Sequence, residues 1–154
     1  MASYKMDYAV RSPARSPTFV DFSPDGRFLA VGDQAPSSLH LLDRRNSFYK
    51  AVGANTSERP TAMVWENSWA FYVGLADGCF TYYRIDLRSV MLVKGILRDG
   101  KLVQGVTNHS FRGVFPITAM ALDAESKTLV ISVGPEVFAF RRIHATSKFR
   151  LSKN

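Results

Sequence analysis

The strongest constraint on the fold is a pattern that occurs three times along the chain. Each copy opens with a proline and an apolar run, passes through a polar turn into a second apolar run, and ends in a third run after another turn. The threonines near the start of the copies, Thr18, Thr61 and Thr118, are 43 and 57 residues apart. A period of about 43 residues is the length of a four-stranded blade in repeat proteins. The chain is therefore predicted to be a β-repeat protein.

The longer second spacing requires an insertion in the second copy, and residues 90–106 supply it. Apolar runs at 91–93 and 102–103 flank the pair Asp99-Gly100. Asp-Gly between apolar runs is a strong hairpin signal, because a type I′ turn needs positive φ at both central positions. We therefore expect a long outer hairpin in the second copy.

Helices contribute little to the predicted fold. Apolar residues make up 46% of the 154 residues and come in short blocks rich in Val, Phe, Tyr and Ile. Turn-forming residues bound these blocks about every 8 to 12 residues, which is typical of all-β proteins. First strands are expected near 19–22, 62–65 and 119–122, with no helix longer than two turns.

The first copy carries a recognisable motif. Residues 22–32 read Phe-Ser-Pro-Asp-Gly-Arg-Phe-Leu-Ala-Val-Gly. This segment resembles the first two strands of a WD40 repeat, and the other copies resemble that repeat more weakly over 17–142. The chain is also similar to short WD40-repeat-like proteins of fungi. The resemblance implies an all-β fold, a partial β-propeller of three WD40-like four-stranded blades at about 17–53, 60–106 and 116–142.

Two features of the WD40 pattern are absent. The first is the Trp-Asp pair at the end of the third strand: the first copy keeps only the aspartate, Asp43, and the other copies keep neither residue. The second is the Gly-His pair that precedes a blade, which no copy has. The hydrogen-bond chain from His through Ser to Trp that the family uses cannot form without these residues. We therefore expect aromatic packing to hold the blades together, with at least one of Trp65 and Trp69 between two blades.

Three blades do not close a propeller ring, because each blade needs a neighbour on both faces. Two interpretations are open: the chain is a remnant or truncated part of a longer propeller, or chains self-associate, as two three-bladed halves making six blades. The basic segments 1–16 and 143–154 could each add an outer strand, at 4–10 and 148–151. Some apolar residues of the first and third blades are expected on outer faces without a neighbour; the candidates are Phe19, Phe22, Phe28, Leu29, Val130, Phe138 and Phe140.

The net charge of +7 lies at the two ends of the chain. Residues 1–16 carry a net charge of +2 and residues 141–154 a net charge of +5, so the part between them is neutral. A nucleic-acid-binding domain usually gathers its cations on one folded face. Nucleic-acid (RNA) binding through the basic termini is therefore the less favoured alternative.

No group of residues has the spacing of a catalytic or metal site. His40 is predicted to be a structural or exposed residue within a strand, and His109 and His144 have no Cys, Asp or Glu at ligand spacing. The single cysteine, Cys79, has no partner for an internal disulfide and is expected to be a core thiol. We therefore expect no cofactor, no metal and no enzymatic activity. A propeller-type enzyme is the least favoured alternative.

Two sets of loops form the candidate binding site: the loops that lead into the first strands and the loops between second and third strands. In the WD40 family these leading loops share the usual partner-binding face with the loops between second and third strands, and the resemblance implies such a face here. Arginine with aromatic residues is typical of interface hot spots. The candidate partner-binding residues are Arg15, Arg59, Arg112, Phe111 and Phe115 in the leading loops, and Gln34, Asp77 and Glu136 in the other loops.

These observations favour a non-enzymatic protein–protein interaction scaffold of the WD40 type, whose partners the sequence does not specify. No apolar run approaches the roughly 20 residues that cross a bilayer, and the first ten residues lack the apolar core of a signal peptide. Neither a membrane partner nor secretion is therefore expected. A single cysteine is consistent with a reducing compartment, and the expected location is the cytoplasm or the nucleus.

Overall fold

The computed structural model describes residues 2–6, 14–48, 51–98, 101–104, 115–142 and 149–151. One short 3₁₀ helix, Arg44–Asn46 (η1), and thirteen β-strands lie within these residues. The strands are β1 (Pro17–Phe22), β2 (Phe28–Gln34), β3 (Ser37–Asp43), β4 (Ala51–Asn55), β5 (Pro60–Asn67), β6 (Ala70–Leu75), β7 (Phe80–Asp86), β8 (Met91–Arg98), β9 (Lys101–Gln104), β10 (Ile117–Asp123), β11 (Thr128–Val133), β12 (Glu136–Arg142) and β13 (Phe149–Leu151). The described part of the chain is thus nearly all β, as predicted.

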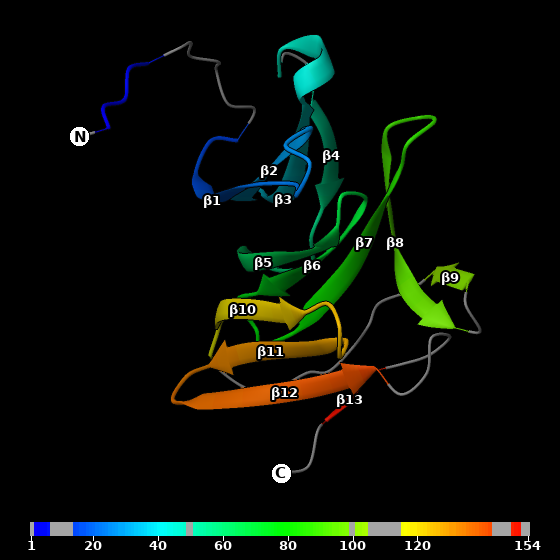
Figure 1. Ribbon diagram of the computed structural model, residues 1–154. Helices are drawn as coiled ribbons and strands as arrows, with labels where there is room; N and C mark the ends of the chain where they lie inside the picture. The colour runs from blue at the N-terminus through cyan, green and yellow to red at the C-terminus, as the bar shows by residue number, and fades with distance from the viewer. Residues whose placement is uncertain are drawn as a thin grey trace.

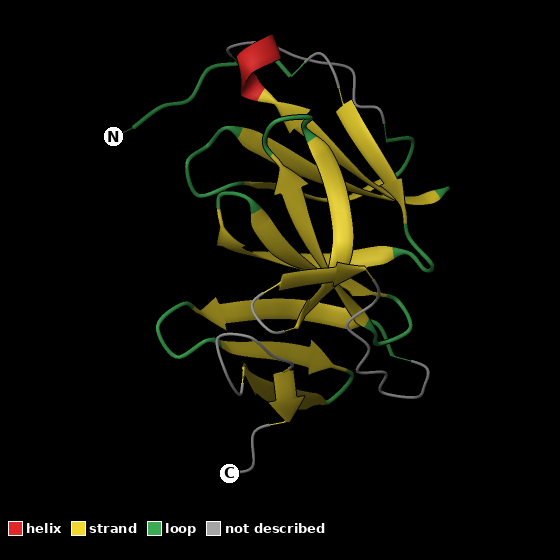
Figure 2. Ribbon diagram, turned by 90° about the vertical axis from the view of Figure 1, so that its right-hand side faces the viewer, coloured by secondary structure: helices red, strands yellow, loops and turns green. Residues whose placement is uncertain are grey.

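The strands form three antiparallel sheets, in each of which consecutive strands pair (Figure 1). Blade 1 consists of β1 to β4, blade 2 of β5 to β9 and blade 3 of β10 to β13. The blades are stacked one on another with blade 2 in the middle, as two perpendicular views show (Figures 1 and 2). This arrangement is a partial β-propeller of three blades and confirms the predicted fold class.

The turn between β1 and β2 shows why the motif of the first copy folds as it does. Gly26 has a φ of 72°, in the left-handed region that a residue without a Cβ adopts at low cost. The Asp25 carboxylate accepts hydrogen bonds from Ser23 Oγ at 2.7 Å and from Arg27 N at 3.1 Å. These contacts reverse the chain direction and let β1 and β2 pair.

An apolar core fills the space between blades 1 and 2. Phe28 and Leu39 of blade 1 are fully buried in it, together with Phe71 of blade 2. The ring of Trp65 packs against the same core, 4.8 Å from the ring of Phe71 between centroids. Trp65 therefore packs between two blades, as predicted, whereas Trp69 is 46% exposed.

Blades 2 and 3 enclose a second apolar core. Phe80 of blade 2 and Phe140 of blade 3 meet edge to face, with ring centroids 5.5 Å apart. Ile117 and Leu129 of blade 3 are fully buried beside them. Aromatic and aliphatic side chains thus fill both joints, which is the packing expected in the absence of the WD40 hydrogen-bond residues.

The outer faces of blades 1 and 3 expose fewer large side chains than the sequence suggests. Four of the candidates for these faces lie instead at the cores against blade 2: Phe28 and Phe140 are buried in them, and Phe19 and Phe138 pack against them. The alternation of side chains along a strand puts them on the inner side of their sheets. Phe22, 47% exposed, lies on the outer side, as predicted.

The chain itself covers part of the outer face of blade 1. Ala14, which precedes β1, and Phe48, which follows η1, bury Val31 and Leu42 in a small third core. The ring of Phe48 lies 6.1 Å from that of Phe22 between centroids. The covered area therefore lies mainly over β2 and β3.

Two segments add outer strands, to blades 2 and 3. β8 pairs with β9 as the predicted outer hairpin, with Arg98 opposite Lys101, and the turn residues 99–100 lie outside the described part of the chain. At the C-terminal end, β13 pairs with β12 where an outer strand of blade 3 belongs. Residues 2–6 form no strand, and the remainder of the N-terminal strand expected at 4–10 lies outside the described residues.

Candidate interaction site

In blades 1 and 2 the leading loop is bound to the loop between the second and third strands. The Ser16 carbonyl accepts a hydrogen bond from Gln34 N at 3.1 Å, and the Arg59 carbonyl accepts one from Ala76 N at 2.8 Å. Backbone bonds of this kind fix the two loops relative to the sheet. Arg15 therefore lies near Gln34, and Arg59 lies near Asp77, one residue beyond the bonded pair.

Blade 3 brings the corresponding loops together through an aromatic ring. Gly134, in the turn between β11 and β12, has a φ of 56°, and a Cβ added to it would lie only 2.9 Å from Cγ of Phe115. The Phe115 ring therefore rests on the backbone of this turn, which leads into Glu136 at the start of β12. We call the surface formed by Arg15, Gln34, Arg59, Asp77, Phe115 and Glu136 the loop face.

Most side chains of the loop face are accessible. Phe115 is 53% exposed, and Arg15, Gln34, Arg59 and Glu136 also fall in the exposed range. The half-buried Asp77 uses its carboxylate to accept a hydrogen bond from Cys79 N at 3.1 Å and acts first as a turn former. The other two predicted site residues, Phe111 and Arg112, lie outside the described residues.

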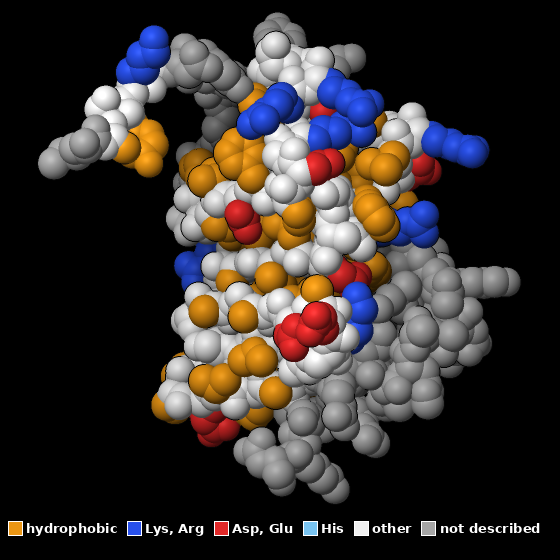
Figure 3. Space-filling view, in the orientation of Figure 1, with side chains coloured by type: hydrophobic (Ala, Val, Ile, Leu, Met, Phe, Trp, Pro, Cys, Tyr) orange, Lys and Arg blue, Asp and Glu red, His pale blue; other side chains and the backbone are white. Residues whose placement is uncertain are grey.

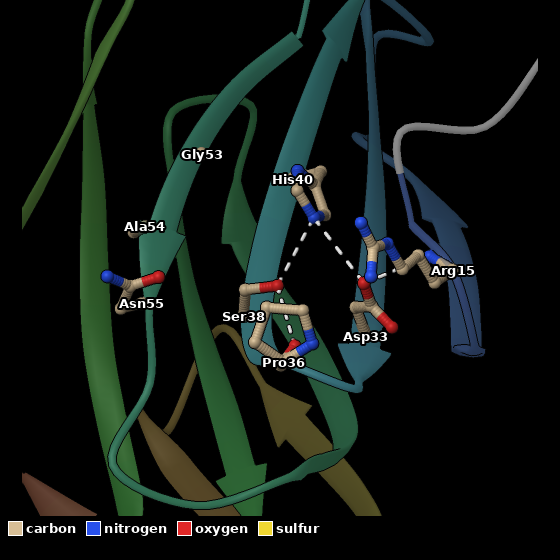
Figure 4. Close-up of a pocket in the computed structure, with 8 residues that line it drawn as sticks. All are labelled: Arg15, Asp33, Pro36, Ser38, His40, Gly53, Ala54 and Asn55. Carbon is tan, nitrogen blue, oxygen red and sulfur yellow. Dashed lines mark hydrogen bonds and ion pairs between the residues drawn. The ribbon is translucent and has the colours of Figure 1, made fainter.

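A small hollow of about 260 Å³ opens on the outer face of blade 1, beside the loop face. Asp33 lies on β2, Ser38 and His40 lie on β3, and β4 forms the opposite wall (Figure 4). The lining residues are Arg15, Asp33, Pro36, Ser38, His40, Gly53, Ala54 and Asn55.

Asp33 fixes the leading loop of blade 1. Its buried carboxylate accepts hydrogen bonds from the backbone N–H groups of Ser16, Arg15 and Ala35, at 2.9, 3.1 and 3.2 Å. Burial raises the pKa of this carboxyl, but the three backbone donors and the nearby His40 outweigh that effect and hold the pKa below its ordinary value. Asp33 is therefore ionised at neutral pH and holds the backbone of Arg15 at the loop face.

His40 lies between this carboxylate and a hydroxyl group. Its Nε2 atom is 3.2 Å from Ser38 Oγ and 3.9 Å from Asp33 Oδ2 (Figure 4). In a hydrolytic triad the acid and the nucleophile bind different ring nitrogens, whereas here both lie near Nε2. Ser38 Oγ also donates to the Pro36 carbonyl at 3.0 Å. The cluster therefore lacks triad geometry and presents polar groups to the hollow.

The sequence identifies His40 as a strand residue and misses its cluster with Asp33 and Ser38. The strand register supplies the missing signal, because it pairs Asp33 with Ser38 and Val31 with His40. Residues at alternate positions of paired strands share one face of the sheet. The register depends on the turn at 35–36, which the sequence pattern does not define.

A second hollow of about 790 Å³ lies on blade 2, near the turn between β7 and β8. It is lined by Trp69, Arg84, Ile85, Asp86, Leu87, Arg88 and Val93. Over the residues that the structure describes, no three His, Cys, Asp or Glu side chains are grouped so that they could hold a metal ion.

No helix in the described part of the chain has the length and apolar character needed to cross a membrane. The side chains of the basic C-terminal segment, on which the nucleic-acid alternative mainly depends, are outside those described. That alternative stays a prediction.

No family model matches the chain, and no curated protein matches its sequence. Solved structures with a similar fold include a chain of the Mitotic Checkpoint Complex, with 16% identity and a TM-score of 0.58, matched over 81% of this chain and 35% of that chain. They include hydrazine synthase of Kuenenia stuttgartiensis, with 16% identity, a TM-score of 0.57 and coverage of 90% and 36%. A proposed 6-phosphogluconolactonase of Bacteroides fragilis NCTC 9343 matches with 14% identity, a TM-score of 0.60 and coverage of 93% and 39%.

These similarities show a propeller-type fold, and the chain spans little more than a third of the length of each solved chain.

The expectation that the chain is not an enzyme is corrected by the same comparison. Two of the three solved chains bear the names of enzymes. One fold can carry unrelated activities. The propeller fold therefore gives no ground for excluding catalysis.

Proposed function

We propose that this chain is a WD40-like protein-interaction module that binds a protein partner through the loop face. The observation that carries the proposal is the fixed pairing of the leading loops with the loops between second and third strands in all three blades. Loops held by a rigid sheet are common binding elements. The resemblance of 22–32 to a WD40 repeat supports the same assignment.

The chemistry of the loop face fits a protein surface that offers both acidic and apolar groups. Arg15 and Arg59 are exposed and extend from two neighbouring blades, while Phe115 offers an aromatic ring on the third. Arginine and aromatic side chains contribute most of the binding energy in many interfaces. Glu136 adds an acidic group that favours one orientation of the partner.

The test is affinity purification of the full chain from cell extract, with quantitative mass spectrometry. We compare the unchanged chain, an Arg15→Glu/Arg59→Glu variant and an Arg45→Glu/Arg88→Glu control. The control makes the same charge change at exposed arginines of the opposite loops, after β3 and β7. Proteins lost with the first variant and kept with the control support the proposal; a set of proteins that is the same for both variants contradicts it.

A further inference from the structure

Both internal blade joints contain the same contact between a hydroxyl and a carbonyl. Thr18 Oγ1 of blade 1 donates to the Pro60 carbonyl of blade 2 at 2.8 Å. Thr61 Oγ1 of blade 2 donates to the Ile117 carbonyl of blade 3. In each case the donor is near the start of one first strand and the acceptor begins the next first strand. The contact therefore marks a joint between consecutive blades.

Blade 3 carries the donor of this contact at its open side. Thr118 is exposed, and its hydroxyl lies 2.7 Å from Ser132 Oγ and 3.3 Å from the Ser132 carbonyl, within its own blade. Thr61 makes the matching contact within blade 2, to the Gly74 carbonyl at 3.2 Å, in addition to its contact with blade 3. Thr118 is thus placed like Thr61, with no following blade in the described part of the chain.

The side of a first strand that faces the preceding blade carries two large apolar residues. In β5 these are Met63 and Trp65, which pack into the core against blade 1, and β10 has an equivalent pair in the core against blade 2. The pair at the same positions of β1 is Val20 and Phe22, which are 64% and 47% exposed. Blade 1 therefore has the side chains of a joint that no other blade covers in the described part of the chain.

In β5 and β10 the opposite side of the first strand carries smaller residues, whereas β1 has Phe19 there, packed against the core shared with blade 2. In β5, Ala62 and Val64 pack against the core shared with blade 3. The corresponding residues of β10, Ala119 and Ala121, are exposed. Apolar side chains are visible on the surface of the lowest blade (Figure 3). The open sides of blades 1 and 3 are therefore complementary, one with large and one with small apolar side chains.

We propose that a second copy of this chain binds head to tail, with blade 1 of each copy on blade 3 of the other, to form a closed ring of six blades. Val20 and Phe22 of one copy pack on Ala119 and Ala121 of the other. Thr118 Oγ1 donates to the carbonyl of Pro17, which begins β1 as Pro60 begins β5.

Two observations favour a second copy as the occupant. Both incomplete halves of the joint occur in the same chain, so one further copy completes both. Six blades lie within the range of four to eight that closed propellers have, and two head-to-tail joints between two copies close the assembly. Ala14 and Phe48 cover Val31 and Leu42 on β2 and β3, and they leave Val20 of β1 accessible.

Sedimentation of the full chain at micromolar concentration tests the proposal. We expect a particle of about twice the 17.2 kDa mass of one chain.

Val20→Glu and Ala121→Glu each place a carboxylate in the joint and should weaken dimerisation by about 100-fold or more. Both positions are exposed in the single chain, so the variants should fold, which circular dichroism checks. Leu87→Glu, at a residue 49% exposed on another surface, is the matched control and should leave the dimer intact.

An equimolar mixture of the two variants identifies the type of joint. One joint of the mixed dimer combines an unchanged blade 1 with an unchanged blade 3, so we expect mixed dimers where each variant alone is monomeric. A monomeric unchanged chain, a dimer insensitive to both variants, or a mixture that stays monomeric would each overturn the proposal. Arg59→Glu alone changes the loop face on the middle blade, away from both open sides, and should dimerise normally, so this proposal and that of the loop face can fail independently.

Discussion

The side chain of Ile117 in blade 3 occupies the space in which a Cβ on Gly74 of blade 2 would lie. A Cβ built on Gly74 would be 2.6 Å from Cγ2 of Ile117, well inside the normal contact distance. Ile117 is fully buried there, at the start of the first strand of its blade. The absence of a side chain at Gly74 therefore sets how closely blades 2 and 3 approach.

Gly74→Ala should lower the free energy of unfolding by about 1 to 3 kcal/mol, because the added methyl group overpacks the joint. Urea denaturation followed by tryptophan fluorescence measures the change. Gly53→Ala is the control, since its Cβ would meet His40 Nδ1 at an ordinary 3.5 Å, and its effect should stay within about 0.5 kcal/mol. Equal losses for the two variants would contradict the close approach at Gly74.

Thr61→Val should lower the free energy of unfolding by about 1 kcal/mol, because valine keeps the shape of threonine but cannot donate to the Ile117 carbonyl. The same denaturation assay applies. Thr56→Val removes a hydroxyl that bonds only the nearby Glu58 carbonyl, and its effect should be smaller. A Thr61→Val protein as stable as the unchanged chain would show that the hydroxyl adds nothing to the joint.

The stability of the protein should depend on pH through Asp43. Burial raises the pKa of this carboxyl, but the Arg27 guanidinium, 3.0 Å away, and the backbone N–H of Arg45 outweigh that effect and lower the pKa below its ordinary 3.8. On acidification the unfolded chain therefore takes up the proton first. The stabilisation is complete above the unfolded pKa and is lost as the pH falls through the lower folded value.

Urea midpoints between pH 6 and pH 3 measure this dependence. Asp43→Asn should be less stable than the unchanged chain at pH 6, because Arg27 loses its charged partner. The difference should shrink toward pH 3, because there the Asp43 carboxyl of the unfolded unchanged chain takes up a proton before that of the folded chain. A difference that stays constant over this range would show that Asp43 does not titrate with a lowered pKa.

Much of the fold follows from the sequence because side-chain alternation and turn chemistry are local. The turn at Asp25 and Gly26 needs no distant contact to form, and the first strand that follows each opening proline lies where the pattern predicts. The inner position of Phe28 and Phe140 does not follow from the pattern. Alternation separates the two faces of a strand but does not say which face meets the next blade.

The candidate site likewise has features that the sequence predicts and features that it does not. The proximity of the leading loops to the other loops was expected only through the WD40 resemblance, and the bonds that make it, such as Ser16 with Gln34, are between backbone atoms. Sequence patterns contain no direct sign of such bonds. The cluster of Asp33, Ser38 and His40 depends on the register of one hairpin, and a shift of one residue would put these side chains on opposite faces.

Phe140→Ala should uncouple blade 3 from the rest of the chain. Phe140 is 1% exposed and its ring meets Phe80 across the joint, so its truncation should cost about 3 to 5 kcal/mol. In a repeat protein each unit is stabilised mainly by its neighbours. Because the core between blades 1 and 2 is separate from the one that contains Phe140, the loss falls on the joint between blades 2 and 3.

We therefore expect two unfolding transitions in the Phe140→Ala protein, where the unchanged chain shows one. Limited proteolysis at low denaturant should cut blade 3 before it cuts blades 1 and 2. The expected cleavage site is the turn between β10 and β11, at 124–127. Phe115→Ala is the matched control, because this phenylalanine is 53% exposed and lies outside both cores. It should keep a single transition. A single transition with an unchanged midpoint for Phe140→Ala would mean that the contact with Phe80 does not hold blade 3 in place.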